Sequence, residues 1–282
     1  MFERAPILII LLSITALGGC SPMTLLSAVS PSGHYQRIAD LAYGGHEYQR
    51  LDVYRPKGAE PGAPLVVYFY GGGWRKGSKD EFEFVASSLT RAGLVVVIPD
   101  YRRFPEVSFP DFIDDGARAT AWAITRAAEF GADGRNVYLM GHSAGAQIAA
   151  LLAYDRRYLD AAGVEAPGIA GFIGLSGPYD FLPLTEDNYL LEVFPEASRA
   201  ESQAINFVAA DSPRTLLIHG GDDDIVEPGN SERLAARLQL HGVPVTLKNY
   251  ANAGHGRVVV ALAPPLDFIA STLKDCIDFV LR

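Results

Sequence analysis

Residues 137–152, Val-Tyr-Leu-Met-Gly-His-Ser-Ala-Gly-Ala-Gln-Ile-Ala-Ala-Leu-Leu, decide the fold of this chain. The apolar run before the first glycine and the alanine-rich run after the second predict a buried strand that passes through a tight turn into a helix. Gly141 and Gly145 flank Ser143 in a G-x-S-x-G pattern, at positions where side chains would collide as the chain reverses. The pattern therefore predicts a serine hydroxyl held at the apex of the turn, where it can act as a nucleophile.

Strand-like and helical stretches alternate on both sides of this turn. Strands are expected at residues 48–54, 64–70, 94–99, 136–140, 169–175, 214–219 and 243–250. Helices are expected at residues 78–92, 112–130, 144–154, 230–241 and 266–281, the first of them opened by a Ser78-x-x-Glu81 capping box. This alternation predicts an α/β fold with a doubly wound, mostly parallel sheet flanked by helices. The long irregular connection at residues 180–212 is a candidate for a small lid insertion.

Composition limits the possible classes of function. A chain of 282 residues with 49% hydrophobic residues can bury a large core as one α/β domain. The formal net charge of -9 and the lack of a Lys/Arg cluster argue against nucleic-acid binding. Cys20 and Cys276 are the two cysteines, and Cys276 is expected to be a small core residue. The composition carries no signal for an oligomeric state.

The N-terminus is expected to be a separate module. Arg4 precedes an apolar stretch at residues 5–17, which has the length of a signal-peptide core and is short for a membrane span. The stretch ends in Leu17-Gly18-Gly19-Cys20, which resembles the lipobox of bacterial lipoproteins, where cleavage leaves a lipid-modified cysteine. We therefore expect a signal peptide at residues 1–19, a tether at 20–34 and a folded domain at 35–282. The protein would be exported and held at a membrane of the bacterial cell envelope only through lipid on Cys20, and an ordinary signal peptide or an uncleaved anchor is the alternative.

A glycine-rich loop follows the expected strand at 64–70. Its sequence, Tyr70-Gly71-Gly72-Gly73-Trp74, allows backbone N–H groups to turn toward a developing negative oxygen. Gly72 and Gly73, together with the N–H of Ala144, are therefore the predicted donors of an oxyanion hole. A plain glycine turn is the alternative interpretation.

The base should be one of six histidines, and position argues against five of them: His34, His46, His142, His219 and His241. The side chain of His142 should project away from the neighbouring Ser143 hydroxyl, and His219 is expected to be a structural residue beneath the site. His255 remains, in a glycine-flanked loop just after the final strand. The loops at that edge of a parallel sheet are where ligands bind, so His255 is the predicted base.

The acid should come from the loop after the preceding strand, where Asp222, Asp223 and Asp224 stand in a row. One of them must turn inward to hold the imidazole of the base. Three adjacent aspartates could instead bind a cation, but no further oxygen ligands follow at the spacing of a metal loop, so no metal is expected. The serine, an acid and the histidine then follow one another in the chain order typical of α/β-hydrolases.

Several stretches together resemble the α/β-hydrolase carboxylesterases related to hormone-sensitive lipase and the BD-FAE-like esterases, over residues 48–282. The matching stretches are residues 51–54, 71–74, 99–102, 141–145, 219–226 and 254–255. In these relatives the acid lies four residues after a strand-end histidine and three before a valine, which selects Asp223. They usually carry histidine at the position of Tyr70, where it braces the loop without being a donor. The resemblance implies that the oxyanion hole survives this change, with altered loop geometry.

The resemblance implies a serine hydrolase that cleaves carboxylic esters of small molecules through an acyl-enzyme, with no metal or organic cofactor. Residues 100–150 also resemble plant isoprenylcysteine methylesterases and, less closely, arylformamidases. The alternatives are therefore an arylformamidase, another amidase or a peptidase with the same triad. A catalytically inactive binding protein is disfavoured because all three triad residues are present. Three further residues are expected to contact the substrate: Trp74, His142 and Tyr179.

Overall fold

The computed structural model describes residues 22–58, 60–164, 168–185 and 189–282. The expected signal peptide and Cys20 lie outside these residues. Within the described ranges, every helix is too short or too polar to cross a membrane.

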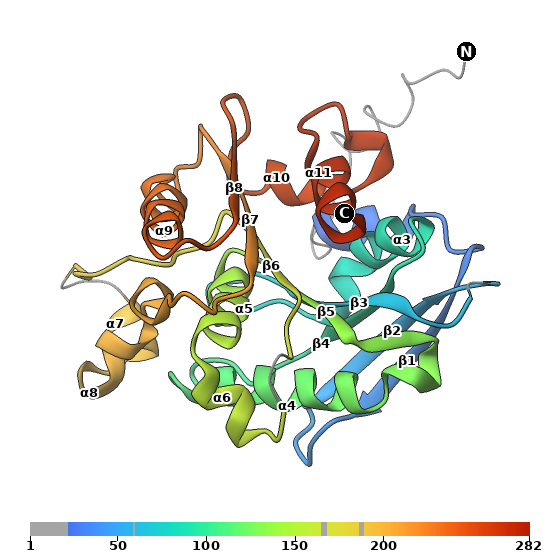
Figure 1. Ribbon diagram of the computed structural model, residues 1–282, viewed down its shortest axis with the longest axis horizontal. Coiled ribbons are helices and arrows are strands. Elements are labelled where there is room, and N and C mark those ends of the chain that lie inside the picture. The colour runs from blue at the N-terminus through green and yellow to red at the C-terminus, as the bar shows by residue number, and fades with distance from the viewer. Residues whose placement is uncertain (1–21, 59, 165–167, 186–188) are drawn as a thin grey trace.

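Eight strands of the described chain form one sheet, in the order β1-β2-β4-β3-β5-β6-β7-β8 (Figure 1). The pairs β1–β2 and β2–β4 are antiparallel, and all other neighbours are parallel. The prediction of a doubly wound, mostly parallel sheet is thus confirmed. The strands are β1 (Tyr35–Ala42), β2 (Arg50–Pro56), β3 (Ala63–Phe69), β4 (Val95–Pro99), β5 (Ala132–His142), β6 (Gly171–Leu175), β7 (Arg214–Gly220) and β8 (Val245–Tyr250).

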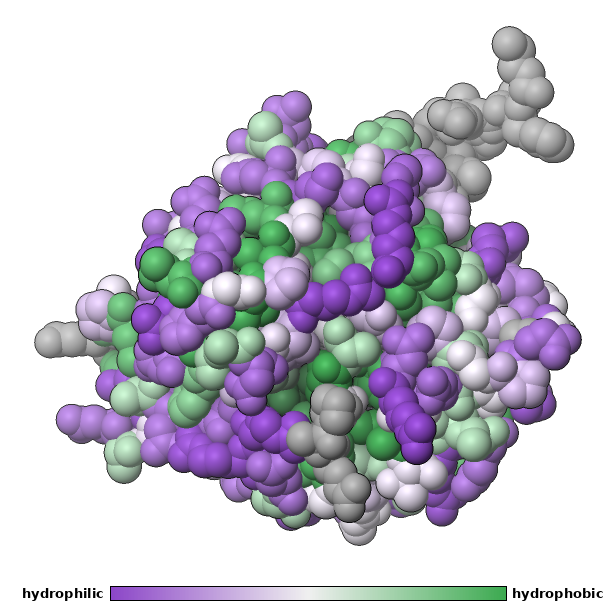
Figure 2. Space-filling view, in the orientation of Figure 1, coloured by the Kyte–Doolittle hydropathy of each residue, from purple (hydrophilic) through white to green (hydrophobic). Residues whose placement is uncertain are grey.

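Helices cover both faces of the sheet. In Figure 1, α3 (Glu83–Arg91) and α11 (Thr272–Leu281) lie together on one face, and α4 (Asp111–Thr125), α5 (Ala144–Tyr154) and α6 (Arg156–Ala161) lie on the other. α9 (Gly229–Leu240) contacts β7 and β8. Figure 2 shows polar and charged side chains over most of one face of the molecule, with apolar side chains gathered in separate patches between them. Short helices complete the chain: α7 (Leu190–Val193), α8 (Glu196–Arg199), η4 (Ala200–Ser202), η5 (Ala204–Phe207) and α10 (Arg257–Val260).

Three of the expected helices differ from the structure. The helix expected at 78–92 begins as a 3-10 turn, η2 (Lys79–Phe82), where Ser78 Oγ accepts from the Asp80 N–H at 3.3 Å. The helix expected at 112–130 ends at Thr125 and is followed by η3 (Ala127–Phe130). The helix expected at 266–281 occupies only the second part of that range, preceded by η6 (Pro264–Leu266).

The edge strands also depart from expectation. All seven expected strands are present, but β1 was not expected because its side chains alternate poorly between buried and exposed positions. β8 is largely exposed, since it closes the sheet at its outer edge. Prediction of a strand from its pattern of apolar residues works best where both faces of the strand are covered, as they are in β4 and β6.

The expected tether contains a helix. Residues Pro22–Ala28 form α2, which contacts η2 and α3. The Leu26 side chain is buried in the core, and Ser27 Oγ donates to the Glu81 carbonyl oxygen at 2.8 Å. Ser87 Oγ donates to the Pro31 carbonyl oxygen at 2.6 Å. The described part of residues 20–34 therefore packs on the domain, because an apolar residue of α2 finds a place in its core.

The candidate lid at residues 180–212 is fastened to the domain in its middle. Val193 and Phe194 are fully buried, and the Phe109 N–H donates to the Val193 carbonyl oxygen at 2.8 Å. The Phe194 ring meets the Trp74 ring edge-on at a centroid distance of 4.9 Å. The described part of the segment thus forms a wall beside the glycine-rich loop, and its movement as a lid stays a prediction.

We expect Leu26→Ala to lower the free energy of unfolding by about 2–4 kcal/mol, because the change leaves a cavity where α2 meets the core. The matched control is Val29→Ala, since Val29 is 68% exposed just after α2, and this change should cost less than about 0.5 kcal/mol. Urea unfolding measures both. Equal, small effects would mean that α2 does not pack on the domain in solution.

Candidate active site

The serine of the G-x-S-x-G pattern stands at a sharp turn between β5 and α5. Ser143 has φ 54° and ψ -126°, a backbone conformation that non-glycine residues rarely adopt. A Cβ on Gly141 would lie 2.3 Å from the carbonyl oxygen of Gly145, and a Cβ on Gly145 would lie 2.1 Å from the carbonyl oxygen of Phe69. Both flanking positions therefore need glycine, and the turn presents Ser143 toward the carboxyl edge of the sheet.

The predicted base and acid lie in line with this serine. His255 Nε2 is 2.9 Å from Ser143 Oγ, and His255 Nδ1 is 2.9 Å from Asp223 Oδ2. Their loops are joined, because the Asp222 N–H donates to the Ala253 carbonyl oxygen at 3.1 Å. A carboxylate can only accept, so Nδ1 carries the proton and Nε2 is free to accept from the Ser143 hydroxyl. The structure thus brings together the three residues that the sequence singled out, with Asp223 as the acid.

Asp223 is a buried carboxylate with several donors. The Ile225 and Val226 N–H groups donate to Oδ1 at 3.1 and 2.9 Å, and His219 Nε2 lies 3.3 Å from Oδ2. Burial acts to raise the pKa of Asp223, but the hydrogen bonds from His219, His255 and the Val226 N–H outweigh it and hold the pKa well below its ordinary value. Asp223 therefore stays ionised and can stabilise a protonated His255.

His219 supports Asp223 from behind. Its Nε2–H donates to the Val226 carbonyl oxygen at 2.9 Å, and its Nδ1 is 2.7 Å from Ser231 Oγ. The ring is 1% exposed. Since a carbonyl can only accept, Nε2 bears a proton, and both ring nitrogens of His219 have hydrogen-bond partners. The expectation that His219 is a hydrogen-bonding residue beneath the site agrees with this placement.

His142 lies beside the base instead of beside the serine hydroxyl. Its Nε2–H donates to the backbone carbonyl oxygen of His255 at 3.0 Å, and the two rings are 4.8 Å apart. Burial, together with the neighbouring His255, lowers the pKa of His142 from 6.5 to about 3. His142 is therefore a neutral donor that holds the loop of His255 in place.

The glycine-rich loop lies directly against the serine. A Cβ on Gly71 would be 2.9 Å from the Ser143 Cβ, so the loop can approach only because that position is glycine. Gly72 and Gly73 have φ of 142° and 62°. Within the described chain, the N–H groups of Gly72, Gly73 and Ala144 donate to no other group. They are placed to serve as free donors, and their binding of an oxyanion stays a prediction.

A cleft of about 1140 Å³ opens over Ser143 and His255. Its walls come from residues 72–76, residues 180–185 and the start of α9. Trp74 and His142 line this cleft, and their contact with a substrate stays a prediction. The expectation for Tyr179 is wrong. Its ring is fully buried and packs edge-on against Phe172 at 6.1 Å, because the chain turns inward after β6.

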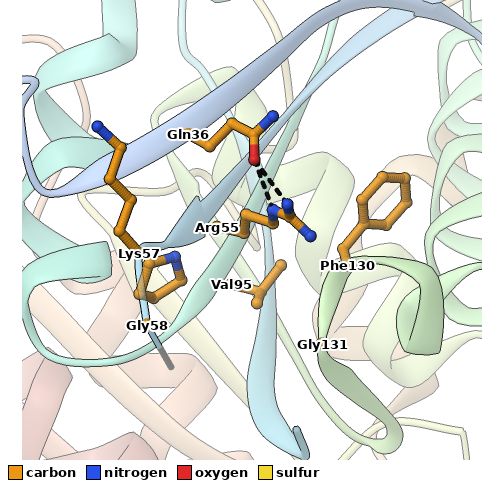
Figure 3. Close-up of a pocket in the computed structure, with 8 residues that line it drawn as sticks. Gln36, Arg55, Lys57, Gly58, Val95, Phe130 and Gly131 are labelled. Atoms are coloured by element: carbon orange, nitrogen blue, oxygen red, sulfur yellow. Dashed lines mark hydrogen bonds between the residues drawn. The ribbon is translucent and has the colours of Figure 1, made fainter. Parts of the chain in front are cut away.

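A smaller hollow of about 310 Å³ lies far from the triad, between β1, β2 and η3 (Figure 3). There Arg55 donates from Nε and Nη2 to the side-chain oxygen of Gln36, at 2.9 and 2.6 Å, and the Phe130 ring forms another wall. None of the residues that line it is Asp, Glu, His, Ser or Cys. Among the described residues, no group of three His, Cys, Asp or Glu is arranged to hold a metal ion.

Two residues of the site escaped the sequence analysis. Gln147 is fully buried on α5, where it accepts from Trp74 Nε1–H at 3.1 Å and donates to the Ser202 carbonyl oxygen at 2.9 Å. A lone glutamine in an alanine-rich helix is the signal that could have revealed it. Tyr189 donates from its hydroxyl to the Gly73 carbonyl oxygen at 3.3 Å, and no local pattern announces that contact.

A serine at a strand–helix turn, a histidine and a buried aspartate on successive loops of one mostly parallel sheet define an α/β-hydrolase. The family model of BD-FAE matches residues 51–238 of this chain. The chain therefore belongs to the BD-FAE family.

Curated relatives and a solved structure are similar to this chain. Kynurenine formamidase of Danio rerio is 30% identical over 235 residues, covering 80% of this chain and 77% of its own length. A probable isoprenylcysteine alpha-carbonyl methylesterase of Arabidopsis thaliana is 28% identical over 236 residues, 76% of this chain and 56% of its own. The chain thus spans just over half the length of the plant relatives it matches. Esterase B from Lactobacillus rhamnosis shares the fold, with a TM-score of 0.79 at 20% identity over 99% of this chain and 96% of its own.

We expect Asp223→Asn to lower kcat for a short aryl ester about 10⁴-fold, because an amide at this position favours the wrong tautomer of His255. Asp222→Asn and Asp224→Asn are the matched controls, since both side chains are exposed neighbours and should change kcat less than about twofold. Steady-state kinetics of the three variants measures the difference. A larger loss from either control would assign the acid to that residue.

His142 should make stability depend on pH. The folded protein keeps this ring neutral, whereas the unfolded chain takes up a proton below the ordinary pKa of 6.5. The stability it contributes is complete above about pH 6.5 and is lost as the pH falls toward 3. Between pH 7 and pH 5 the wild type should lose about 2 kcal/mol more free energy of unfolding than His142→Gln. Urea unfolding at the two pH values measures this difference, and equal losses would contradict it.

Proposed function

We propose that this protein is a serine carboxylesterase that acts on small-molecule esters. The observation that carries the proposal is the unbroken hydrogen-bond chain from Ser143 through His255 to Asp223, at the floor of an open cleft. Membership of the BD-FAE family supports it. So do the free N–H groups of Gly72 and Gly73, which line the same cleft.

In the first step, Ser143 Oγ attacks the carbonyl carbon of the ester while its proton passes to His255 Nε2. The carbonyl π electrons move to oxygen, and the N–H groups of Gly72, Gly73 and Ala144 donate hydrogen bonds to this negative oxygen. Asp223 stabilises the imidazolium that forms. Collapse of the tetrahedral intermediate breaks the ester C–O bond, and the leaving alcohol oxygen takes the proton from His255.

Water then completes the reaction. His255 Nε2 removes a proton from a water molecule, which attacks the acyl carbon of the acyl-enzyme. The second tetrahedral intermediate collapses by breaking the bond to Ser143 Oγ, which regains its proton from His255. The carboxylic acid then leaves. Apart from water, every group that acts in these steps is a residue of this chain.

Formamide hydrolysis is the second candidate. The observation that favours it is the similarity to kynurenine formamidase of Danio rerio, which extends over 80% of this chain. The same triad serves both reactions, because an amide differs from an ester only in the leaving group that His255 must protonate. A cleft of about 1140 Å³ admits an aryl group on either kind of substrate.

We expect purified residues 22–282 to hydrolyse short-chain aryl esters, and to be labelled at Ser143 by a fluorophosphonate. Ser143→Ala should abolish both, and His255→Ala should lower kcat by about 10⁴-fold or more, because His255 is the base that contacts the hydroxyl among the described residues. Activity should be profiled on paired aryl esters and N-formyl aryl amines. Turnover retained by Ser143→Ala would overturn the triad, and a preference for the formamide of every pair would establish the second candidate instead.

A further inference from the structure

The glycine-rich loop is fastened at both ends to one short segment. The loop begins at Tyr70, directly after β3, and ends at Lys79, the first residue of η2. Residues Asp100 to Arg103 follow β4 and lie between these two ends.

The first end of the loop is held through Tyr70. Its hydroxyl donates to Asp100 Oδ1 at 2.6 Å and accepts from Arg103 Nη1 at 3.3 Å. The Tyr101 hydroxyl donates to the Tyr70 carbonyl oxygen at 2.9 Å. Both the side chain and the peptide group that enters the loop are therefore fixed.

The returning end meets the same two charged residues. The Lys79 N–H donates to Asp100 Oδ1 at 2.8 Å, so one carboxylate oxygen accepts from both ends of the loop. Arg103 Nη1 also donates to the Gly77 carbonyl oxygen. Gly77 has φ 108°, and a Cβ there would lie 2.8 Å from the Tyr70 ring. The two ends are thus packed together as well as hydrogen-bonded.

This arrangement is mounted on the sheet. The Asp100 N–H donates to the Arg50 carbonyl oxygen of β2 at 2.9 Å. The fully buried Tyr70 ring is stacked between the rings of Phe82 and Tyr101, at centroid distances of 5.5 and 4.9 Å. A loop whose ends are tied to a rigid sheet keeps its internal N–H groups in one place.

We propose that Tyr70, Asp100 and Arg103 are positioning residues that hold the N–H groups of Gly72 and Gly73 where the oxyanion forms. We call these three residues the clasp. The inference rests on the proposed function, because it concerns the oxyanion of that reaction. Charged partners make the hydrogen bonds of the clasp strong and directional, and oxyanion donors act only when they are placed before the charge develops. In this chain, the buried Tyr70 and the half-buried Asp100 fix the two ends of the loop.

Tyr70→Phe tests the clasp, because it removes one oxygen and keeps the stacked ring. The matched control is Tyr68→Phe. Tyr68 lies two residues earlier, on β3, and is fully buried, and its hydroxyl has no hydrogen-bond partner in the described chain. Tyr70→Phe should lower kcat for a short aryl ester about 10- to 100-fold with KM changed less than about twofold, and Tyr68→Phe should leave both within about twofold.

The affinity for a trifluoromethyl ketone distinguishes positioning of the oxyanion donors from a purely structural role of Tyr70. This inhibitor bonds to Ser143 and carries an oxyanion. Tyr70→Phe should weaken its binding by the same factor as kcat, because both depend on the donors of the oxyanion hole. The pH dependence of kcat should keep its midpoint, since the triad is untouched. Unchanged ketone binding, or equal losses in the two tyrosine variants, would overturn the clasp.

The rate of fluorophosphonate labelling separates this inference from the proposed function. If the wild type is not labelled, Ser143 is not a nucleophile and the proposed function fails. If the wild type is labelled and Tyr70→Phe is labelled at the same rate, only the clasp fails. Asp100→Ala should slow labelling as well, and the double variant should be no slower than about the worse single variant, because both changes remove the hydrogen bond between Tyr70 and Asp100. If the losses of the two single variants multiply in the double variant, the two residues do not act through one contact, and the clasp is contradicted.

Discussion

The close approach of three backbones at the end of β3 and β5 is the constraint on which the site depends. A Cβ on Gly145 would lie 2.1 Å from the carbonyl oxygen of Phe69, and a Cβ on Gly71 would lie 2.9 Å from the Ser143 Cβ. Glycine at these points lets the nucleophile turn and the glycine-rich loop share one edge of the sheet. Without that contact, the serine and the N–H groups that face it would belong to separate parts of the surface.

A buried charge organises the other half of the site. The Asp223 carboxylate is out of contact with solvent, so its oxygens need donors, and these come from its own loop, from His219 and from His255. The same need orients the His255 ring, because its Nδ1–H is one of those donors. His142 then fixes the backbone of that histidine. Two further histidines thus support a third that must exchange a proton.

Patterns confined to one segment were the most reliable guide. The helix after Ser143 has the bounds expected from its composition, because the turn before it and the buried face along it are both written in residues 141–154. The edge strands, α2 and Tyr179 differ from expectation for one reason. Whether β8 is covered, whether Leu26 finds a core, or whether a tyrosine turns inward depends on neighbours that are distant in the sequence.

The sequence by itself determined the fold class. It also predicted Ser143 as the nucleophile, with His255 and the glycine-rich loop as its partners, because each prediction rests on short-range chemistry: a turn that only glycine allows, or a residue type at a strand end. The export signal at residues 1–20 stays a prediction of the sequence alone. Only the tertiary structure decided which contacts support the site, among them His219 with Asp223, Gln147 with Trp74, and the clasp of Tyr70, Asp100 and Arg103. His219 and Asp223 are 4 residues apart, in and just after the same strand. Tyr70 and Asp100 are 30 residues apart and Trp74 and Gln147 are 73, and they meet because the parallel sheet brings the carboxyl ends of its strands to one edge.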